Sequence, residues 1–386
     1  MATHRRLTTH TWRYTALLAA LAAALLVATG CGSSGSGNDS SAGASSTSSG
    51  GVPEGVALAE SIVKKAGTRP TTVSVTEPIG KTVPAGKKVV FISCGVEACN
   101  VQGKIIAQGA KDLGWSASTI ATDGSPEKLQ GAFDTALRNG ADAVILNAVN
   151  RAAVAKQIAT AQKKGVAFVT CCSTEKVGNG ILYNTSTADQ NSEIGRDLAA
   201  QVVADSKGKA DTLYVNISAF EILANLGTAF QKSYKDYCPD CSMAAIDIPL
   251  TALGKDAPDR IVSYLRSHPK VGYVALSVSD ALGTGLPAAL QAAGLGGKVK
   301  IVGQGASTQI YQYISGGQVQ SVVPFDYYAV DYQMLDALAR HFAGVPIQQT
   351  APPRWLMSKE GLPSTSDLFP VVENYRSQFL KLWGKA

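Results

Sequence analysis

Short apolar runs rich in β-branched residues alternate with longer amphipathic segments from Lys87 onward. The runs are continuous rather than alternating, which is typical of strands that are buried on both faces. The segments between them carry helix signals: one starts at Ser125 with an N-cap serine, a first-turn proline and an early acid, and it ends at Gly140. The pattern therefore predicts an α/β fold in which helices cover parallel sheets. The predicted strands are residues 89–93, 117–121, 143–147, 166–170, 213–217, 243–248, 272–277, 300–304 and 319–323.

The strand–helix pattern occurs twice, with one set of units before Tyr183 and another after it. Each set is close to the size of one doubly wound lobe of parallel strands. In such sheets a ligand binds outside the carboxyl ends of the strands, so two lobes that face each other form a cleft there. We place lobe 1 at residues 87–184 plus 325–350, and lobe 2 at residues 185–324 plus 351–386, the latter with a C-terminal tail.

The chain opens with a basic segment that leads into an apolar one. Arg5 and Arg6 lie in the basic part, and residues 15–29 form an apolar run that is shorter than the roughly twenty residues of a membrane-spanning helix. The run ends in Ala-Thr-Gly before Cys31, which resembles a lipobox. Residues 1–30 are therefore predicted to be a lipoprotein signal peptide, and Cys31 is expected to carry the lipid, with acyl chains such as palmitate. The alternative is an ordinary signal peptide with a cysteine near its end.

Two segments lie between the leader and the first predicted strand. Residues 31–52 consist almost entirely of small and polar residues, so they are predicted to be a flexible tether. Residues 53–86 form an N-terminal extension, in which 55–67 has the pattern of a short amphipathic helix. The C-terminal stretch from Ser366 also has helical spacing, and we expect it to pack on a lobe.

Composition and charge bear on one question, whether the protein binds nucleic acid. The apolar share of 45% is normal for a globular protein. The formal net charge of +6 includes the basic start of the leader, and the rest of the chain has no block of Lys and Arg. We therefore expect no nucleic-acid partner.

Six of the seven cysteines remain once Cys31 is set aside, and they form three close pairs. An even number outside the membrane suggests disulfides, although nearness alone does not fix the pairing. The adjacent pair is the most unusual, because a bond between neighbours closes a strained ring that would present a flat apolar patch to a ligand. The alternatives for it are two free thiols, or a bond from one of the two to the first pair. The candidate cysteines are Cys94, Cys99, Cys171, Cys172, Cys238 and Cys241.

Enzyme chemistry has little support in the sequence. Cys238 and Cys241 have the Cys-x-x-Cys spacing of thiol–disulfide oxidoreductases, but they follow a predicted helix, whose C-terminal dipole opposes a thiolate. This position favours a structural disulfide. The chain has no Gly-x-Ser-x-Gly, His-Glu-x-x-His or phosphate-loop motif, and no strand–helix turn carries Gly-x-Gly-x-x-Gly. We therefore expect no catalysis, no cofactor and no metal ion.

Several stretches carry a family resemblance in their order and spacing. They are VVFISCGVEACNVQGKIIAQGAKDLGW, SPEKLQGAFDTALRNGADAVILNAVNRAAV, KKGVAFVTCC, RIVSYLRSHPKVGYVALSVSDALGTGLPAALQAAGL and KVKIVGQGAS. Together they resemble type I periplasmic binding proteins, the ribose- and galactose-binding group, over about residues 87–350. The resemblance implies two lobes joined by a three-segment hinge, which close on a ligand.

The positions that grip a sugar in that group are mostly small or apolar in this chain. An Asp-Arg pair that usually follows the fourth strand corresponds to Cys172-Ser173, and an Asn-Asp pair after a later strand corresponds to Ser277-Val278. Leu226 stands where an arginine is usual. Since unpaired buried hydroxyls cost about 1–3 kcal/mol each, these changes predict a less polar ligand, such as an aromatic ring or an alicyclic acid.

The ends of the predicted strands supply the candidate ligand-binding residues. The alternative for each acid is a helix N-cap or a solvated loop charge, and the alternative for the two phenylalanines is a place in the core. The candidates are Glu97, Asn100, Cys172, Ser173, Phe220, Glu221, Asp280, Gln304, Phe325 and Asp326.

The resemblance implies a monomeric solute-binding lipoprotein of an ABC importer, anchored by its lipid on the extracytoplasmic face of the cell membrane. It would bind a small molecule between its lobes and deliver it to a permease that works with an ATPase. One alternative is a sensor that presents its closed form to a receptor, and another is a surface scaffold without a small ligand. The sequence does not identify the ligand.

Overall fold

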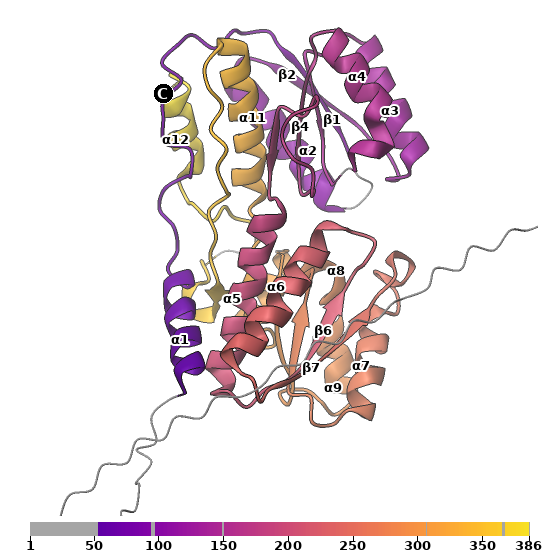
Figure 1. Cartoon of the computed structure of the whole chain (residues 1–386), viewed down its shortest axis with the longest axis vertical. Helices are drawn as coiled ribbons and strands as arrows, with labels where there is room; N and C mark the ends of the chain where they lie inside the picture. The colour runs from indigo at the N-terminus through magenta and orange to yellow at the C-terminus, as the bar shows by residue number, and fades with distance from the viewer. Residues whose placement is uncertain (1–52, 94–96, 149, 306, 365–366, 386) are drawn as a thin grey trace, which may run out of the picture. The chain divides into compact units, whose positions relative to one another are not determined.

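Two β-sheets organise the part of the chain that the structure, a computed structural model, describes (Figure 1). We call the part built on the five-stranded sheet lobe 1, and the part built on the six-stranded sheet lobe 2. Both lobes belong to one compact unit of the chain. The described residues are 53–93, 97–148, 150–305, 307–364 and 367–385.

Lobe 1 contains a parallel sheet with the strand order β2-β1-β3-β4-β5. Helices α2 and α11 cover one face of this sheet, while α3 and α4 cover the other. The apolar runs of the sequence form the sheet because both faces are covered. The elements are β1 (Lys88–Ile92), α2 (Glu97–Asp112), β2 (Ser116–Ile120), α3 (Pro126–Arg138), β3 (Ala143–Leu146), η1 (Arg151–Val154), α4 (Ala155–Lys163), β4 (Ala167–Cys171), β5 (Tyr183–Thr185) and α11 (Tyr327–Ala343).

Lobe 2 has the strand order β11-β10-β9-β8-β6-β7, and all pairs except β10 with β11 are parallel. Helices α5 and α6 pack on one face, and α7, α9 and α10 pack on the other. The elements are α5 (Ala188–Ser206), β6 (Asp211–Asn216), α6 (Ile222–Tyr237), β7 (Ser242–Asp247), η2 (Leu250–Ala252), α7 (Ala257–Ser267), β8 (Tyr273–Leu276), α8 (Ser279–Leu282), α9 (Leu286–Ala292), β9 (Lys300–Gln304), α10 (Thr308–Ser315), β10 (Ser321–Val323), β11 (Met357–Ser358) and η3 (Lys359–Gly361).

The chain crosses between the lobes after β5, after β10 and after α11. Buried Gln333 on α11 links the first and third of these crossings. Its Oε1 accepts a hydrogen bond from the hydroxyl of Thr185 at 3.0 Å, and its Nε2 lies 3.2 Å from both Thr350 Oγ1 and the carbonyl of Ala351. This side chain therefore links two of the three segments that cross between the lobes.

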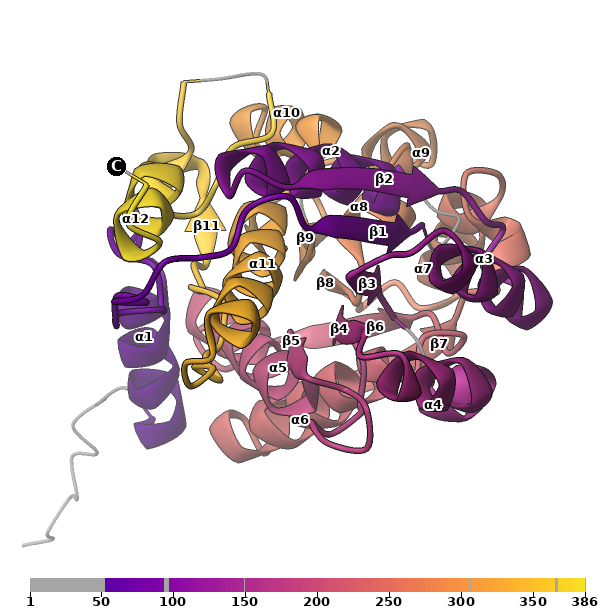
Figure 2. The ribbon, with the colours of Figure 1, turned by 90° about the horizontal axis from the view of Figure 1, so that it is seen from above.

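Both tails pack against the lobes. Helix α1 (Glu54–Ala66) buries its apolar side against α5 and α6, and the segment after it joins the core of lobe 1. Helix α12 (Tyr375–Leu382) lies beside α11, where Trp383 stacks on Tyr332 with 5.5 Å between ring centroids. The indole N–H of Trp383 also donates to Asp336 at 2.9 Å. Figure 2 shows α1 and α12 on the same side of the molecule as α11.

The α/β fold predicted from the sequence is confirmed, and every predicted strand is present. Two strands were not predicted, β5 and β11, which are short and lack an apolar run. Among the described residues, no helix combines the length and the apolar character that a membrane crossing needs. Residues 1–52, with the predicted signal peptide, Cys31 and the predicted tether, lie outside the described part of the chain.

Candidate functional site

A pocket of about 160 Å³, which we call the inner pocket, lies where the carboxyl ends of strands from both sheets meet. Strand ends and helix starts supply its lining, as expected for doubly wound sheets. Lobe 1 contributes Cys99, Gln102, Asn147, Ala148 and Cys172. Lobe 2 contributes Phe220, Ile222, Leu223, Val278, Asp280, Gln304 and Gly305, and the second crossing contributes Phe325 and Tyr327.

A larger pocket of about 470 Å³, which we call the side pocket, adjoins the inner pocket. The two share the lining residues Phe220, Val278, Asp280 and Tyr327, so they are continuous parts of one site. Most of the remaining lining of the side pocket comes from lobe 2. A ligand that fills both parts would contact Asp280 at their boundary.

Asp280 stands in the first turn of α8 and is half-buried. Its Oδ2 accepts a hydrogen bond from the hydroxyl of Tyr327 at 3.3 Å, while its Oδ1 has no hydrogen-bond partner among the described residues. Burial raises the pKa of this carboxyl from 3.8 to about 6, and hydrogen bonds from its own backbone N–H and from Tyr327 oppose the shift. At neutral pH Asp280 is therefore mostly ionised, and its buried Oδ1 accepts no bond from another described residue.

Asn147 lines the same pocket from the lobe 1 side. It follows β3 directly and is only 3% exposed, yet within the described part of the chain neither its amide nitrogen nor its amide oxygen has a partner. An unsatisfied buried amide costs about 1–3 kcal/mol, and natural proteins rarely keep one without a reason. Asn147 thus offers a ligand both a donor and an acceptor.

Behind the lobe 1 wall lies a buried polar cluster. Gln102 Nε2 donates to Asp331 Oδ1 at 2.9 Å, and it also lies 3.9 Å from the Sγ of Cys171. Burial raises the pKa of both the Asp331 carboxyl and the Cys171 thiol well above their usual values. Burial therefore favours the neutral form of both groups.

Of the arrangements that the sequence left open for the adjacent cysteines, the structure has two free thiols, Cys171 and Cys172. The reason lies in the peptide that joins them. Its carbonyl accepts a hydrogen bond from Ala148 N at 2.9 Å, and its N–H donates to the carbonyl of Thr185 at 2.9 Å. These bonds to the chain on both sides hold the peptide in line with β4, so it does not fold into the small ring that a vicinal disulfide needs.

The other cysteines are oxidised where the structure describes them. Cys238 and Cys241 form a disulfide with an S–S distance of 2.02 Å, in the turn between α6 and β7. Cys99 is also disulfide-bonded. Cys94 lies outside the described residues. Across the described residues, no group of three or more His, Cys, Asp or Glu side chains is arranged to hold a metal ion.

Of the ten candidates from the sequence, the structure brings five together in the inner pocket: Cys172, Phe220, Asp280, Gln304 and Phe325.

Four others lie outside the lining of both pockets. Asp326 caps α11, with Oδ1 accepting from Ala329 N at 3.1 Å and Oδ2 accepting from Val371 N at 3.2 Å. Glu221 and Asn100 are exposed. The carbonyl of buried Ser173 accepts a hydrogen bond from Asn184 at 3.1 Å. Glu97 begins α2, and its side chain lies outside the description.

Sequence reasoning missed several lining residues. Asn147 closes a predicted strand, so the rule that ligands meet strand ends was enough to find it. Tyr327 and Gln102 lie on helices, where a polar residue facing a pocket has no signature in a single sequence. Gly305 follows β9 with a φ of 115°, and a Cβ there would lie 2.4 Å from Asp280 Oδ1. A side chain at this position would therefore clash with Asp280 Oδ1, which is buried.

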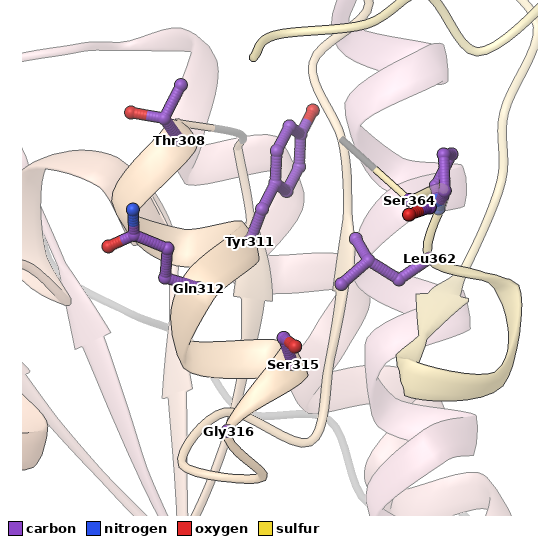
Figure 3. Close-up of a pocket in the computed structure, with 8 residues that line it drawn as sticks. Thr308, Tyr311, Gln312, Ser315, Gly316, Leu362 and Ser364 are labelled. Atoms are coloured by element: carbon purple, nitrogen blue, oxygen red, sulfur yellow. The ribbon is translucent and has the colours of Figure 1, made fainter. Parts of the chain in front are cut away.

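Another hollow of about 610 Å³ lies on lobe 2 between α10 and the segment after η3, and it shares Thr308 with the side pocket. Figure 3 shows Tyr311 and Gln312 on α10 with Leu362 and Ser364 opposite them. We call it the α10 hollow. Its lining contains no residue of lobe 1, so a ligand there would not join the lobes.

Comparison with known proteins agrees with this geometry. The family model described as periplasmic binding protein domain matches residues 98–345, and the chain belongs to that family. Members are solute-binding proteins that act outside the cytoplasm, and the resemblance found in the sequence is confirmed.

Solved structures show the same fold at low identity. A subunit of an ABC sugar transporter from Rhodobacter sphaeroides has a TM-score of 0.62 at 20% identity, covering 72% of this chain and 99% of that one. A 5-methylthioribose transporter solute-binding protein from Thermotoga lettingae has a TM-score of 0.66 at 19% identity, covering 81% and 100%. A glucose-galactose binding protein from Geobacillus stearothermophilus has a TM-score of 0.63 at 17% identity, covering 72% and 100%. No curated protein matches the chain.

Proposed function

We propose that this protein is the solute-binding component of an ABC importer and that it binds a small molecule in the inner pocket. The observation that carries this proposal is Asn147, a buried amide with unmet donors and acceptor among the described residues, which lines the inner pocket from lobe 1 while Asp280 lines it from lobe 2. A ligand that fills the pocket satisfies polar groups on both lobes at once. The family and the structural neighbours support the same function.

Transport follows from a shift between open and closed forms of the lobes. Contacts that need both lobes exist only in the closed form, so a bound ligand favours closure by the free energy of those contacts. The closed form then docks on the permease, and the ATPase on the cytoplasmic side drives release.

The location of the protein is a second part of the proposal, and the sequence before residue 53 supports it. A leader that ends at Cys31 and a segment of small polar residues fit a lipid-anchored protein on a flexible tether. Such a protein acts as a monomer on the outer face of the cell membrane. Radiolabelled palmitate incorporation that depends on Cys31 tests this part, and Cys31→Ala is the matched control.

The ligand is less polar than a free hexose. Apolar side chains form most of the pocket, with Ile222, Leu223 and Val278 on the lobe 2 side and Phe220 and Phe325 beside them. Each hydroxyl of a hexose would need a partner that these residues lack. Among the neighbours, the Thermotoga lettingae protein is described with 5-methylthioribose, a sugar with an apolar substituent.

A thermal-shift screen of the purified protein tests the function. The panel holds sugars, polyols, aromatic and alicyclic compounds, nucleosides and amines. A ligand at a hundred times its dissociation constant adds about 2.7 kcal/mol of stability, which raises the melting temperature visibly. A saturable shift with one class supports the proposal. If no compound raises the melting temperature, the result contradicts the proposal and favours a scaffold. If a compound raises it but the protein does not support uptake by its permease, the result favours a sensor.

A further inference from the structure

The pocket has one fixed charge, and nothing in its described lining balances that charge. Among the described residues that line the inner pocket and the side pocket, Asp280 is the only one with a charged side chain at neutral pH. Burial raises the pKa of the nearby acid Asp331 and so favours its neutral form. The site therefore has a net negative charge facing any ligand.

Other buried carboxyl groups of this protein show how such a charge is normally stabilised. Asp336 pairs with Arg340 at 2.6 Å, and both side chains are almost fully buried. Asp112 pairs with Arg376 at 2.7 Å. The carboxyl of Asp280 has no cation beside it in the described part of the chain, and its hydrogen bonds come from the Tyr327 hydroxyl and its own backbone N–H. A cation in the adjoining pocket would give Asp280 the kind of partner that Arg340 gives Asp336.

We propose, building on the function proposed above, that the solute carries one positively charged amino group, held by Asp280, on a mainly apolar body. Aromatic rings in the same pocket suit this chemistry. Phe325 and Tyr327 meet edge to face with 4.9 Å between centroids, and Phe220 lines the pocket with them. The negative faces of such rings attract cations in sites that exclude water.

Asn147, on the lobe 1 side of the pocket, would bind the same ammonium group of the ligand. Asn147 has an unpartnered amide oxygen among the described residues, and an ammonium has three N–H donors to share. One ammonium that donates to Asp280 and to Asn147 connects lobe 2 to lobe 1, so charge recognition is coupled to closure. The apolar body extends into the side pocket, whose lining continues from Phe220 and Val278.

The proposal narrows the expectation from the sequence, which allowed an acid. A ligand carboxylate would lie against Asp280 with no cation in the described lining to offset the repulsion. A site that excludes water discriminates strongly against a ligand of like charge, because the ligand carboxylate and Asp280 would both be buried without a cation. Acids are therefore rejected, and neutral alcohols bind weakly.

Three probes with one body test the proposal by isothermal titration at pH 7.5: 2-phenylethylamine, 2-phenylethanol and 3-phenylpropanoate. A hydrogen bond to a charged group contributes about 1.5–3 kcal/mol, so the amine should bind at least about tenfold more tightly than the alcohol. Binding of the carboxylate should not be measurable. Asp280→Asn should weaken the amine at least about tenfold and leave the alcohol within about twofold.

Asp259→Asn is the matched control, because Asp259 is an exposed acid on α7 outside both pockets. It changes the net charge equally and should leave all three affinities unchanged, and circular dichroism checks the fold of each variant. The proposal is overturned if the alcohol or the carboxylate binds as tightly as the amine, if Asp280→Asn keeps the preference, or if none of the probes binds. A sugar or nucleoside that binds in the thermal-shift screen would then leave the transport function standing without the amine.

Discussion

Two carboxyl groups, those of Asp280 and Asp326, have similarly raised pKa values but different hydrogen-bond partners. Asp280, at the start of α8, and Asp326, at the start of α11, both have a pKa raised to about 6 by burial. Both oxygens of Asp326 accept backbone N–H bonds, whereas one oxygen of Asp280 has no partner among the described residues and lines two pockets. A raised pKa thus marks burial, and unmet hydrogen-bonding capacity at a pocket marks the binding residue.

The largest expected effect is a loss of stability on removal of Asp326, the acid to which we assign a structural role rather than ligand binding. Asp326→Ala removes the N-cap of α11 and leaves Val371 N without its acceptor, so we expect the free energy of unfolding to fall by about 2–3 kcal/mol. Urea denaturation at pH 7 measures the loss. Asp326→Asn keeps one acceptor oxygen but sets its NH2 group against the other backbone N–H, so it should recover only part of the loss. Full stability of Asp326→Ala combined with lost ligand binding would instead make Asp326 the binding residue.

A second prediction concerns the pH dependence of stability. The folded-state pKa of Asp280 is about 6, above its ordinary value of 3.8, so its favourable contribution is present below pH 3.8 and is lost as pH rises through 6. Asp280→Asn should therefore stabilise the ligand-free protein at pH 8 by about 1–2 kcal/mol, allowing for partial exposure.

Paired urea titrations of the wild type and Asp280→Asn from pH 4 to pH 8 measure this difference. It should approach zero at the acid end. The titratable groups that feel the charge of Asp280 are Tyr327 and Tyr311, whose pKa values are raised by burial and by Asp280, so neither ionises in this range. A constant difference at every pH would show that Asp280 is not the group that titrates.

The smallest expected effect tests the hydrogen bond from the Tyr327 hydroxyl to the Asp280 carboxyl. Tyr327→Phe removes only the hydroxyl that donates to Asp280 Oδ2 at 3.3 Å. Because that bond lowers the pKa of Asp280, its loss should raise the pKa further, with less than about 1 kcal/mol of change in stability. The midpoint of the carboxyl resonance of Asp280 in an NMR titration measures it, and a midpoint that falls would contradict the geometry.

The sequence was sufficient for the fold because the central strands are buried on both faces. Continuous apolar runs between capped helices are a strong local signal, and they placed β1 to β4 and β6 to β10. Strands β5 and β11 form because neighbouring strands are already in place, at the crossing after β4 and beside β10. Pairing of that kind depends on tertiary contacts, which a run of two or three residues does not encode.

The candidate site was predictable in part, for a physical reason. Phe220, Asp280 and Gln304 follow strands, so the rule that ligands bind at strand ends located them. The same rule also selected Asp326, which caps α11 instead. In a sequence, an acid that caps a helix cannot be told from an acid that binds a ligand. Gln102 reaches the pocket from the side of a helix, and only packing determines which of its faces meets the cleft.

The most direct test of the account compares two variants in one titration series. The ligand that gives the largest thermal shift is titrated into the wild type, Asn147→Ala and Gln312→Ala, the last being a change in the α10 hollow. We predict that Asn147→Ala weakens binding at least about tenfold and that Gln312→Ala leaves it within about twofold. The reverse pattern would place the ligand on the outside of lobe 2 and contradict binding between the lobes.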